Sequence, residues 1–179
     1  MASNWQVLKK STLFKGPHNH VQKWRIRLPS GKDKDFSVQE GADFMVMVAM
    51  TPKGKLVAIK QHYVNEHKKI FSLTAGYIDP GEGKAAAARR ELREETGYSC
   101  GRVIYLGKSA KGKYVTGYAH YFLGLDAVRA GDQELEEAEE IDVVLLNLKK
   151  FKKILMEHSF LDVFTEVCAW RALKYLKKI

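Results

Sequence analysis

The first 41 residues consist of short segments of mixed hydrophobic and polar positions that are separated by turn residues. The segments cover residues 5–14, 21–28 and 35–38, and the turns fall at Gly16-Pro17 and at residues 29–32. Gly and Pro between short strand-forming runs favour turns over helices. The pattern therefore predicts an N-terminal antiparallel β-meander.

Residues 42–50 are almost all apolar, which is typical of a central strand buried on both faces. Lys53-Gly54 predicts a turn into a second strand at 55–61. The remaining elements follow from similar patterns: strands at 100–106, 114–125 and 141–146, and helices at 84–96, 148–158 and 161–177. In the last helix we expect a stripe at helical spacing to pack on the core, formed by Val163, Val167, Trp170, Ala172, Leu173 and Tyr175.

The helix at 84–96 carries the candidate chemistry. Its four alanines and Leu92 have high helix propensity, and Gly97 stands where a left-handed residue ends a helix. Glu91, Glu94 and Glu95 are spaced i, i+3 and i+4 and therefore project together, which is unfavourable for like charges. A divalent cation such as Mg²⁺ would remove the repulsion, since it prefers a few carboxylate oxygens completed by water and phosphate. The alternative is a solvated acidic patch tied to the neighbouring arginines.

The residues around these glutamates resemble the Nudix box, Gly-x5-Glu-x7-Arg-Glu-(apolar)-x-Glu-Glu-x-Gly-(apolar). The positions in register are Gly76, Glu82, Arg90, Glu91, Leu92, Glu94, Glu95 and Gly97. Tyr98 stands at the final apolar place. Beyond the box, the run from Phe71 to Glu82 and the strand before it resemble the branch of Nudix hydrolases that cleaves ADP-ribose and nucleoside-diphosphate sugars.

The resemblance implies an α+β fold in which a mixed β-sheet lies between helices (α/β/α), preceded by the antiparallel meander. Residues 42–179 would form the hydrolase domain. Residues 1–41 would form an N-terminal β-layer that pairs two copies into a homodimer and adds to the substrate cleft. Relatives usually read Glu-Leu-Pro where this chain has residues 72–74 (Ser-Leu-Thr), and Tyr-Arg where it has His62-Tyr63. We expect these departures to lie near the substrate and to weaken the case for ADP-ribose itself.

The resemblance also implies roles for single residues. Glu91 and Glu95 would be the main ligands of Mg²⁺, for which Mn²⁺ could substitute, and Glu94 and the carbonyl of Ala75 would contribute. Arg90 would orient the carboxylates and Glu82 would support them from the loop, while Gly76 and Gly97 would be structural. The reaction would be hydrolysis of a pyrophosphate bond to a nucleoside monophosphate and a sugar phosphate.

In this branch the general base comes from a mobile loop outside the box, and here the matching stretch is the acidic run before the last strand. Glu137 is the first candidate, followed by Glu139 and Glu140. A positioned base is worth about 10²–10⁴ in rate. The alternative is that this run is an ordinary flexible loop.

Length and composition agree with a single globular domain: 179 residues, 45% hydrophobic and 28% charged. Cys100 and Cys168 have no metal-site or disulfide spacing and are expected to be buried or incidental. No segment resembles a signal or a membrane span, which predicts a cytoplasmic protein without membrane contact. The net charge of +9 favours polyanionic partners, and the lysines of the C-terminal segment read as a solvated helix face.

We therefore expect a small nucleotide as substrate, and no nucleic acid. One alternative is an RNA 5′-end or dinucleoside-polyphosphate pyrophosphohydrolase, because the basic surface would suit RNA. The other is a Nudix domain without catalysis that senses nucleotides, against which the complete glutamate set argues.

Overall fold

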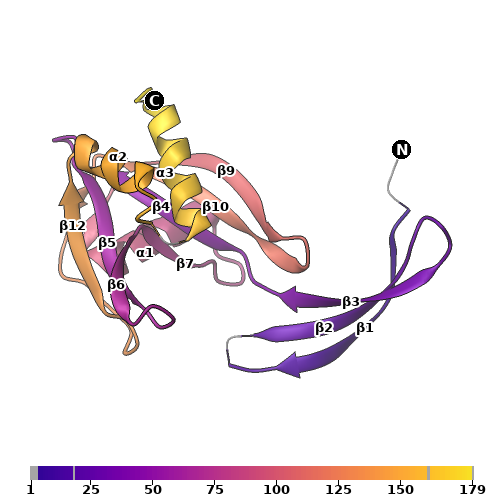
Figure 1. Ribbon diagram of the computed structural model, residues 1–179. Helices are drawn as coiled ribbons and strands as arrows, with labels where there is room; N and C mark the ends of the chain where they lie inside the picture. Colours follow the sequence, from indigo (N-terminus) through magenta and orange to yellow (C-terminus); the bar gives the residue numbers. More distant parts are fainter. Residues whose placement is uncertain (1–3, 18, 161, 179) are drawn as a thin grey trace. The chain divides into compact units, whose positions relative to one another are not determined.

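The computed structural model describes residues 4–17, 19–160 and 162–178. The chain forms two compact units (Figure 1). One consists of Met1–Asp43 and Ser109–Tyr118, and the other of Phe44–Lys108 and Ala119–Ile179. A segment from the middle of the chain thus belongs to the same unit as the N-terminal meander.

The first unit is built on three antiparallel strands: β1 (Gln6–Lys15), β2 (His20–Arg27) and β3 (Asp33–Glu40). The start of β10 (Val115–Leu125) joins β3 in parallel, with Val115 opposite Gln39. All three predicted strands are present, each within two residues of its expected bounds. Trp5 and Phe14 are more than half exposed.

The second unit contains a mixed sheet around β4, whose buried apolar run was predicted to be a central strand. Its strands are β4 (Phe44–Met50), β5 (Leu56–Tyr63), β6 (Lys68–Ser72), β7 (Thr74–Tyr77), β9 (Arg102–Gly112), the second part of β10, and β12 (Ile141–Leu146). β10 runs parallel to one edge of β4. On the other edge, β5 pairs with β4 only at Ala49 and Met50, and β7 pairs with residues 44–47 of β4. β4 and β5 therefore diverge, and between them β7 pairs with β4 while β6 pairs with β5. Two short strands, β8 (Tyr98–Ser99) and β11 (Val128–Arg129), pair separately.

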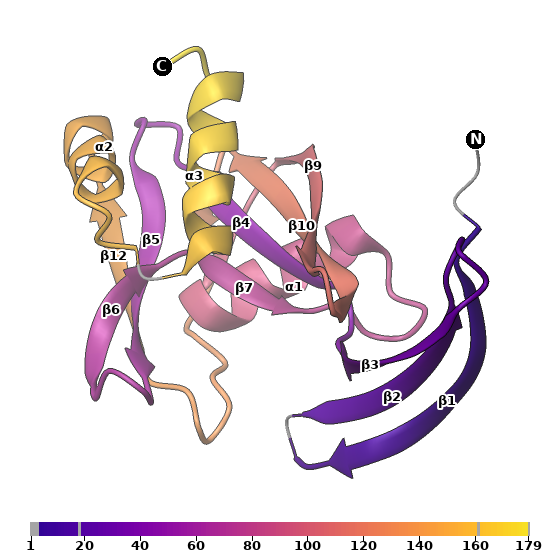
Figure 2. The ribbon, with the colours of Figure 1, turned by 45° about the vertical axis from the view of Figure 1, so that its right-hand side comes forward.

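Helices cover both faces of this sheet (Figure 2). Helix α1 (Lys84–Thr96) packs on the face that carries Met45 and Met47, and its Ala87, Ala88 and Leu92 are buried there. Helices α2 (Leu148–Met156) and α3 (Val163–Tyr175) pack on the face that carries Val46 and Val48. Side chains point alternately to the two faces along β4, so successive residues pack against α1 on one face and against α2 and α3 on the other. The predicted α/β/α arrangement is confirmed. None of the described helices has the length and apolar character that a membrane span requires.

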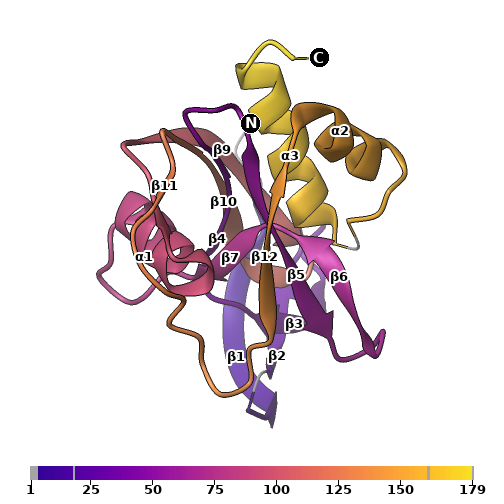
Figure 3. The same cartoon turned by 90° about the vertical axis from the view of Figure 1, so that its left-hand side faces the viewer.

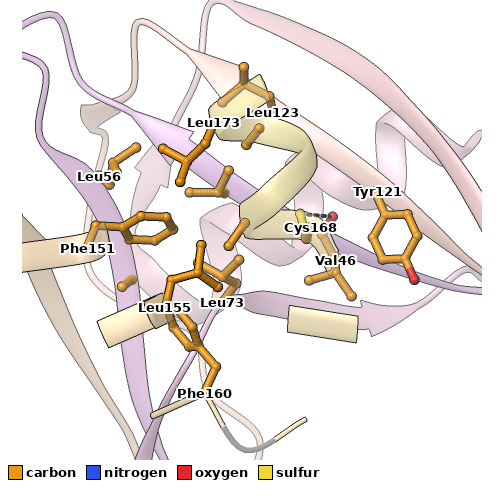
Figure 4. Close-up of a cluster of buried hydrophobic side chains, with 14 of the residues drawn as sticks. Val46, Leu56, Leu73, Tyr121, Leu123, Phe151, Leu155, Phe160, Cys168 and Leu173 are labelled. Atoms are coloured by element: carbon orange, nitrogen blue, oxygen red, sulfur yellow. Dashed lines mark hydrogen bonds between the residues drawn. The ribbon is translucent and has the colours of Figure 1, made fainter. Parts of the chain in front are cut away.

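The core beneath α3 corrects one prediction (Figure 4). The buried residues of α3 are mostly small: Thr165, Cys168, Ala169, Ala172 and Leu173. Val163, Trp170 and Tyr175, which were expected in the core, are exposed. Small side chains let the helix approach the sheet closely, and the larger ones then stand outside the contact. Leu161, the expected first residue of this helix, lies outside the described residues.

Both cysteines are buried and free, as expected. The Cys168 Sγ lies 3.4 Å from the carbonyl oxygen of Val46, and burial raises the pKa of this thiol to about 12. Cys168 therefore behaves as a small core residue. The lysines of the C-terminal helices are mostly exposed, as the pattern predicted.

Candidate active site

Helix α1 has the predicted bounds, Lys84–Thr96, and both ends have a local cause. Gly83 enters the helix in an extended conformation. Gly97 leaves it in the left-handed conformation with φ 70°, and its N–H donates to the carbonyl of Arg93. A Cβ at Gly97 would overlap the carbonyl oxygen of Gly131. Glycine is thus required at position 97 both by the left-handed backbone and by the nearby carbonyl of Gly131.

The short strand β7 brings the start of the box against this helix. Met45 of β4 lies opposite Gly76 in the register. The Ala75 N–H donates to the Glu95 carboxylate at 3.2 Å, and a Cβ at Gly76 would overlap the Glu91 carboxylate. The sequence pattern predicted no strand here, yet Gly76 and Tyr77 belong to β7. The strand position explains why the box needs glycine here: the Glu91 side chain fills the space of the missing Cβ.

Gly76→Ala tests this packing. We expect the variant to lose about 10²-fold in kcat/KM, because the methyl group must push the Glu91 carboxylate from its place and a 1 Å displacement in a site can cost that much. Gly83→Ala is the matched control, since a Cβ there meets nothing closer than the Ala86 Cβ at 4.0 Å. Equal activity of the two variants in the same assay would contradict the view that Gly76 makes room for the Glu91 carboxylate.

Arg90 holds the surrounding carboxylates together. Its Nε and Nη2 donate to the two oxygens of Glu82, each at 3.0 Å. Its Nη1 donates to Glu91 at 2.8 Å and to Glu94 at 2.9 Å, and its Nη2 also reaches the Tyr77 carbonyl at 3.0 Å. These contacts raise the pKa of Arg90, chiefly through Glu82, whose own pKa Arg90 lowers. The structure thus brings Arg90 together with three of the four glutamates of the box.

Glu95 and Glu91 lie in a poorly neutralised region. Glu95 is only 4% exposed. Burial raises its pKa well above the usual value, and the charges of Glu91 and Glu139 add to this, while hydrogen bonds from Ala75 and Thr74 oppose it. Burial also raises the pKa of Glu91, against the effect of Arg90. Two carboxylates that share a buried negative environment fit a binding site for a cation.

The donor set suits a hard divalent cation: carboxylate oxygens on one helix face, beside the strand that carries Ala75. Among the described residues, no three His, Cys, Asp or Glu side chains already surround a point where a metal ion could sit. Arg90 bridges Glu91 and Glu94, and Glu95 is turned to the Ala75 N–H. The contacts with Arg90 use one oxygen each of Glu91 and Glu94, which leaves the second oxygen of each carboxylate as a possible ligand.

The three candidate bases lie in different surroundings (Figure 3 shows the segment between β11 and β12 passing beside α1). Glu137 lies in the turn between Glu136 and Glu139. Glu140 pairs with Lys69 at 3.0 Å. The charge of Glu139 adds to the raised pKa of both Glu91 and Glu95. Glu139 is thus the candidate whose charge acts on the helix glutamates; sequence reasoning favoured Glu137, and the choice among the three stays a prediction.

The residues just before the box are buried. Ser72 and Leu73 are fully buried, and the Ser72 Oγ lies 3.3 Å from the Thr165 Oγ1 of α3. Thr74, which takes the place of the usual proline, is also buried and is hydrogen bonded to Glu95. Leu73 is the residue that relatives usually carry, so the departures here are Ser72, which packs in the core against α3, and Thr74, which contacts a glutamate of the box. That they lie near the substrate stays a prediction.

The fold and the box together define a class of protein. The profile of the NUDIX domain matches residues 41–167. The chain belongs to the Nudix family and is a hydrolase of that family, whose members generally use a divalent metal.

Two relatives of similar length match this chain over nearly its whole length. The ADP-ribose pyrophosphatase of Bacillus subtilis (strain 168) is 27% identical over 175 residues, which cover 96% of this chain and 92% of that protein. The methanol dehydrogenase activator of Bacillus methanolicus is 25% identical over 177 residues, with the same shares of both chains. A crystal structure of an ADP compounds hydrolase superposes with a TM-score of 0.83 at 19% identity, covering 97% of this chain and 95% of that one. The last likeness shows the fold.

Proposed function

We propose that the protein hydrolyses the pyrophosphate bond of a nucleoside-diphosphate sugar, with ADP-ribose as the first candidate, to a nucleoside monophosphate and a sugar phosphate. The observation that carries the proposal is the pair Glu91 and Glu95, packed against β7 in a buried negative region that suits a metal-bound diphosphate. The likeness over nearly the whole chain to an ADP-ribose pyrophosphatase supports the substrate class.

The residues of the box would have the following roles. Glu91, Glu94, Glu95 and the Ala75 carbonyl would hold Mg²⁺, or Mn²⁺ in its place. The bound metal would neutralise charge on the phosphates and acidify a water. Arg90, anchored on Glu82, would keep the carboxylates in position.

The Glu139 carboxylate would accept a proton from the attacking water. The new bond forms between the water oxygen and one phosphorus, and the bond from that phosphorus to the bridging oxygen breaks. The electron pair stays with the bridging oxygen, which leaves on the second phosphate. General base catalysis needs Glu139 within hydrogen-bond reach of that water. The charge of Glu139 acts on Glu91 and Glu95, which supports this role.

A hydrolysis assay with and without metal tests the proposal. We expect ADP-ribose to yield AMP and ribose 5-phosphate with Mg²⁺, and chelation of the metal to abolish turnover. GDP-mannose, a dinucleoside polyphosphate and a 5′-triphosphorylated RNA serve as competing substrates. If the protein with Mg²⁺ releases a monophosphate from none of the sugar nucleotides, the proposed substrate class is wrong.

Two further points stay predictions. Residues 1–41 are proposed to pair two copies of the chain into a homodimer and to complete the substrate cleft. The protein is proposed to act in the cytoplasm, on a small nucleotide.

A further inference from the structure

The C-terminal end of α1 is covered by a segment that comes from far along the chain. The last carbonyls of a helix lack partners within the helix. Here the Glu94 carbonyl accepts the Glu134 N–H at 2.8 Å, and the Glu95 carbonyl accepts the Gln133 Nε2 at 2.7 Å. The Ala130 N–H donates to the Gly97 carbonyl at 2.8 Å. Residues 130–134 therefore form a fixed support on the helix that carries the metal-binding glutamates.

The Gln133 amide makes a second contact, which links the two ends of a loop. Its Nε2 also lies 3.1 Å from the carbonyl oxygen of Ile141, the first residue of β12. A primary amide has two N–H donors, and here one donor faces the helix end and the other faces the strand. The side chain is half-buried, which makes an unpartnered carbonyl costly at either end. One side chain thus holds both ends of the segment 134–140 against the end of α1.

This segment contains Glu139, two residues before Ile141. Glu136 and Glu139 are joined by a turn, in which the Glu139 N–H donates to the Glu136 carbonyl at 3.0 Å and the Glu136 N–H donates to the Glu139 carboxylate at 2.9 Å. Glu140 is held by Lys69 of β6. With both ends of the segment fixed, the turn has little freedom to move Glu139 away from α1.

We infer that Gln133 is a positioning residue, which holds the loop of Glu139 beside the helix of Glu91 and Glu95 by tying both ends of that loop to the end of α1. The inference rests on the proposed function, because it assigns Glu139 the role of base. Gln133 itself does not touch the reacting atoms.

The first test uses Gln133→Met, which keeps the length of the side chain and removes both donors. We expect kcat to fall about 10- to 100-fold, as is typical when a supporting contact of a metal site is lost. KM should stay within about twofold, because uniform binding is unaffected. Lys149→Met, at the exposed start of α2, is the control and should equal the wild type.

A double-mutant cycle with Glu139→Gln separates positioning from general destabilisation. If Gln133 acts through Glu139, the double variant should be no slower than Glu139→Gln alone, since residues that act as a unit are not additive. Additive losses would overturn the inference, and so would a slow Gln133→Met beside an unimpaired Glu139→Gln. Gln133→Glu, which sets a carboxylate against two carbonyl oxygens, should be slower than Gln133→Met.

A second readout needs no turnover. The loop holds several glutamates, so a glutamate-specific protease reports its opening in the folded protein. We expect cleavage within residues 134–140 to be about tenfold faster in Gln133→Met than in the wild type and in Lys149→Met, equivalent to about 1.4 kcal/mol. Unchanged cleavage would overturn the inference. If the wild type hydrolyses no nucleotide but cleavage accelerates as expected, the proposed function fails and the tie made by Gln133 stands.

Discussion

Replacing Glu95 by Gln should nearly abolish hydrolysis while making the metal-free protein more stable. We expect kcat/KM to fall by about 10³-fold, since losing about 4 kcal/mol of charge stabilisation by a metal has that effect. The amide oxygen of the new side chain can still accept the Ala75 N–H, so the loss would come from the missing charge. Residual activity within a few fold of the wild type would exclude Glu95 as a ligand.

The gain in stability follows from the direction of the pKa shift. Burial raises the pKa of Glu95 in the folded state, so folded protein binds its proton more tightly than unfolded protein. Without metal, wild-type stability should fall as pH rises from about 4.3, the ordinary pKa of Glu, through the raised pKa, and should then stay low. Glu95→Gln cannot ionise and avoids this loss.

Thermal unfolding across pH measures the effect. At pH 8 in chelator we expect the Glu95→Gln variant to unfold about 3 °C higher than the wild type for each kcal/mol relieved. Mg²⁺ should raise the midpoint of the wild type and leave that of the variant almost unchanged. Midpoints that respond equally to Mg²⁺ would contradict a metal site at Glu95.

Glu139→Gln is expected to lower kcat by about 10²–10⁴, the usual worth of a general base. KM and the stability gained from Mg²⁺ should change little, because the residue is proposed to act on the water and not on the metal. Glu139 is chosen among the three because its charge adds to the raised pKa values of Glu91 and Glu95.

Glu137→Gln and Glu140→Gln are the matched controls in the same loop. Glu137→Gln should keep kcat near that of the wild type, and Glu140→Gln should cost only what the pairing with Lys69 contributes to the order of the loop. If Glu137→Gln is the slowest of the three, the base is Glu137 and the assignment to Glu139 is wrong.

The sequence predicted the elements whose signals are local. The bounds of α1 followed from its alanines and from Gly97, and β12 followed from a run of apolar residues with the expected ends. β7 could not be found in this way. It has only four residues, Thr74–Tyr77, and it exists because β4 and β5 diverge and leave an edge for it.

The candidate site likewise contains residues whose placement has a local sequence signal and residues whose placement has none. The box placed Glu82, Arg90 and the three helix glutamates together, because their spacing along one loop and one helix fixes their positions. The choice among the acidic-loop residues depended on a turn that sequence could not locate. Gln133 left no signal at all, since both carbonyls that it binds belong to segments whose relation to it appears only in the folded chain.

The tie made by Gln133 has a consequence for how this enzyme could diversify. Gln133 joins both ends of residues 134–140 to the end of α1, and lengthening a loop between fixed ends costs little: doubling it costs only about 0.6 kcal/mol. Insertions in this segment that keep Glu139 in place would therefore change the surface beside the proposed metal site with little effect on the rest of the fold.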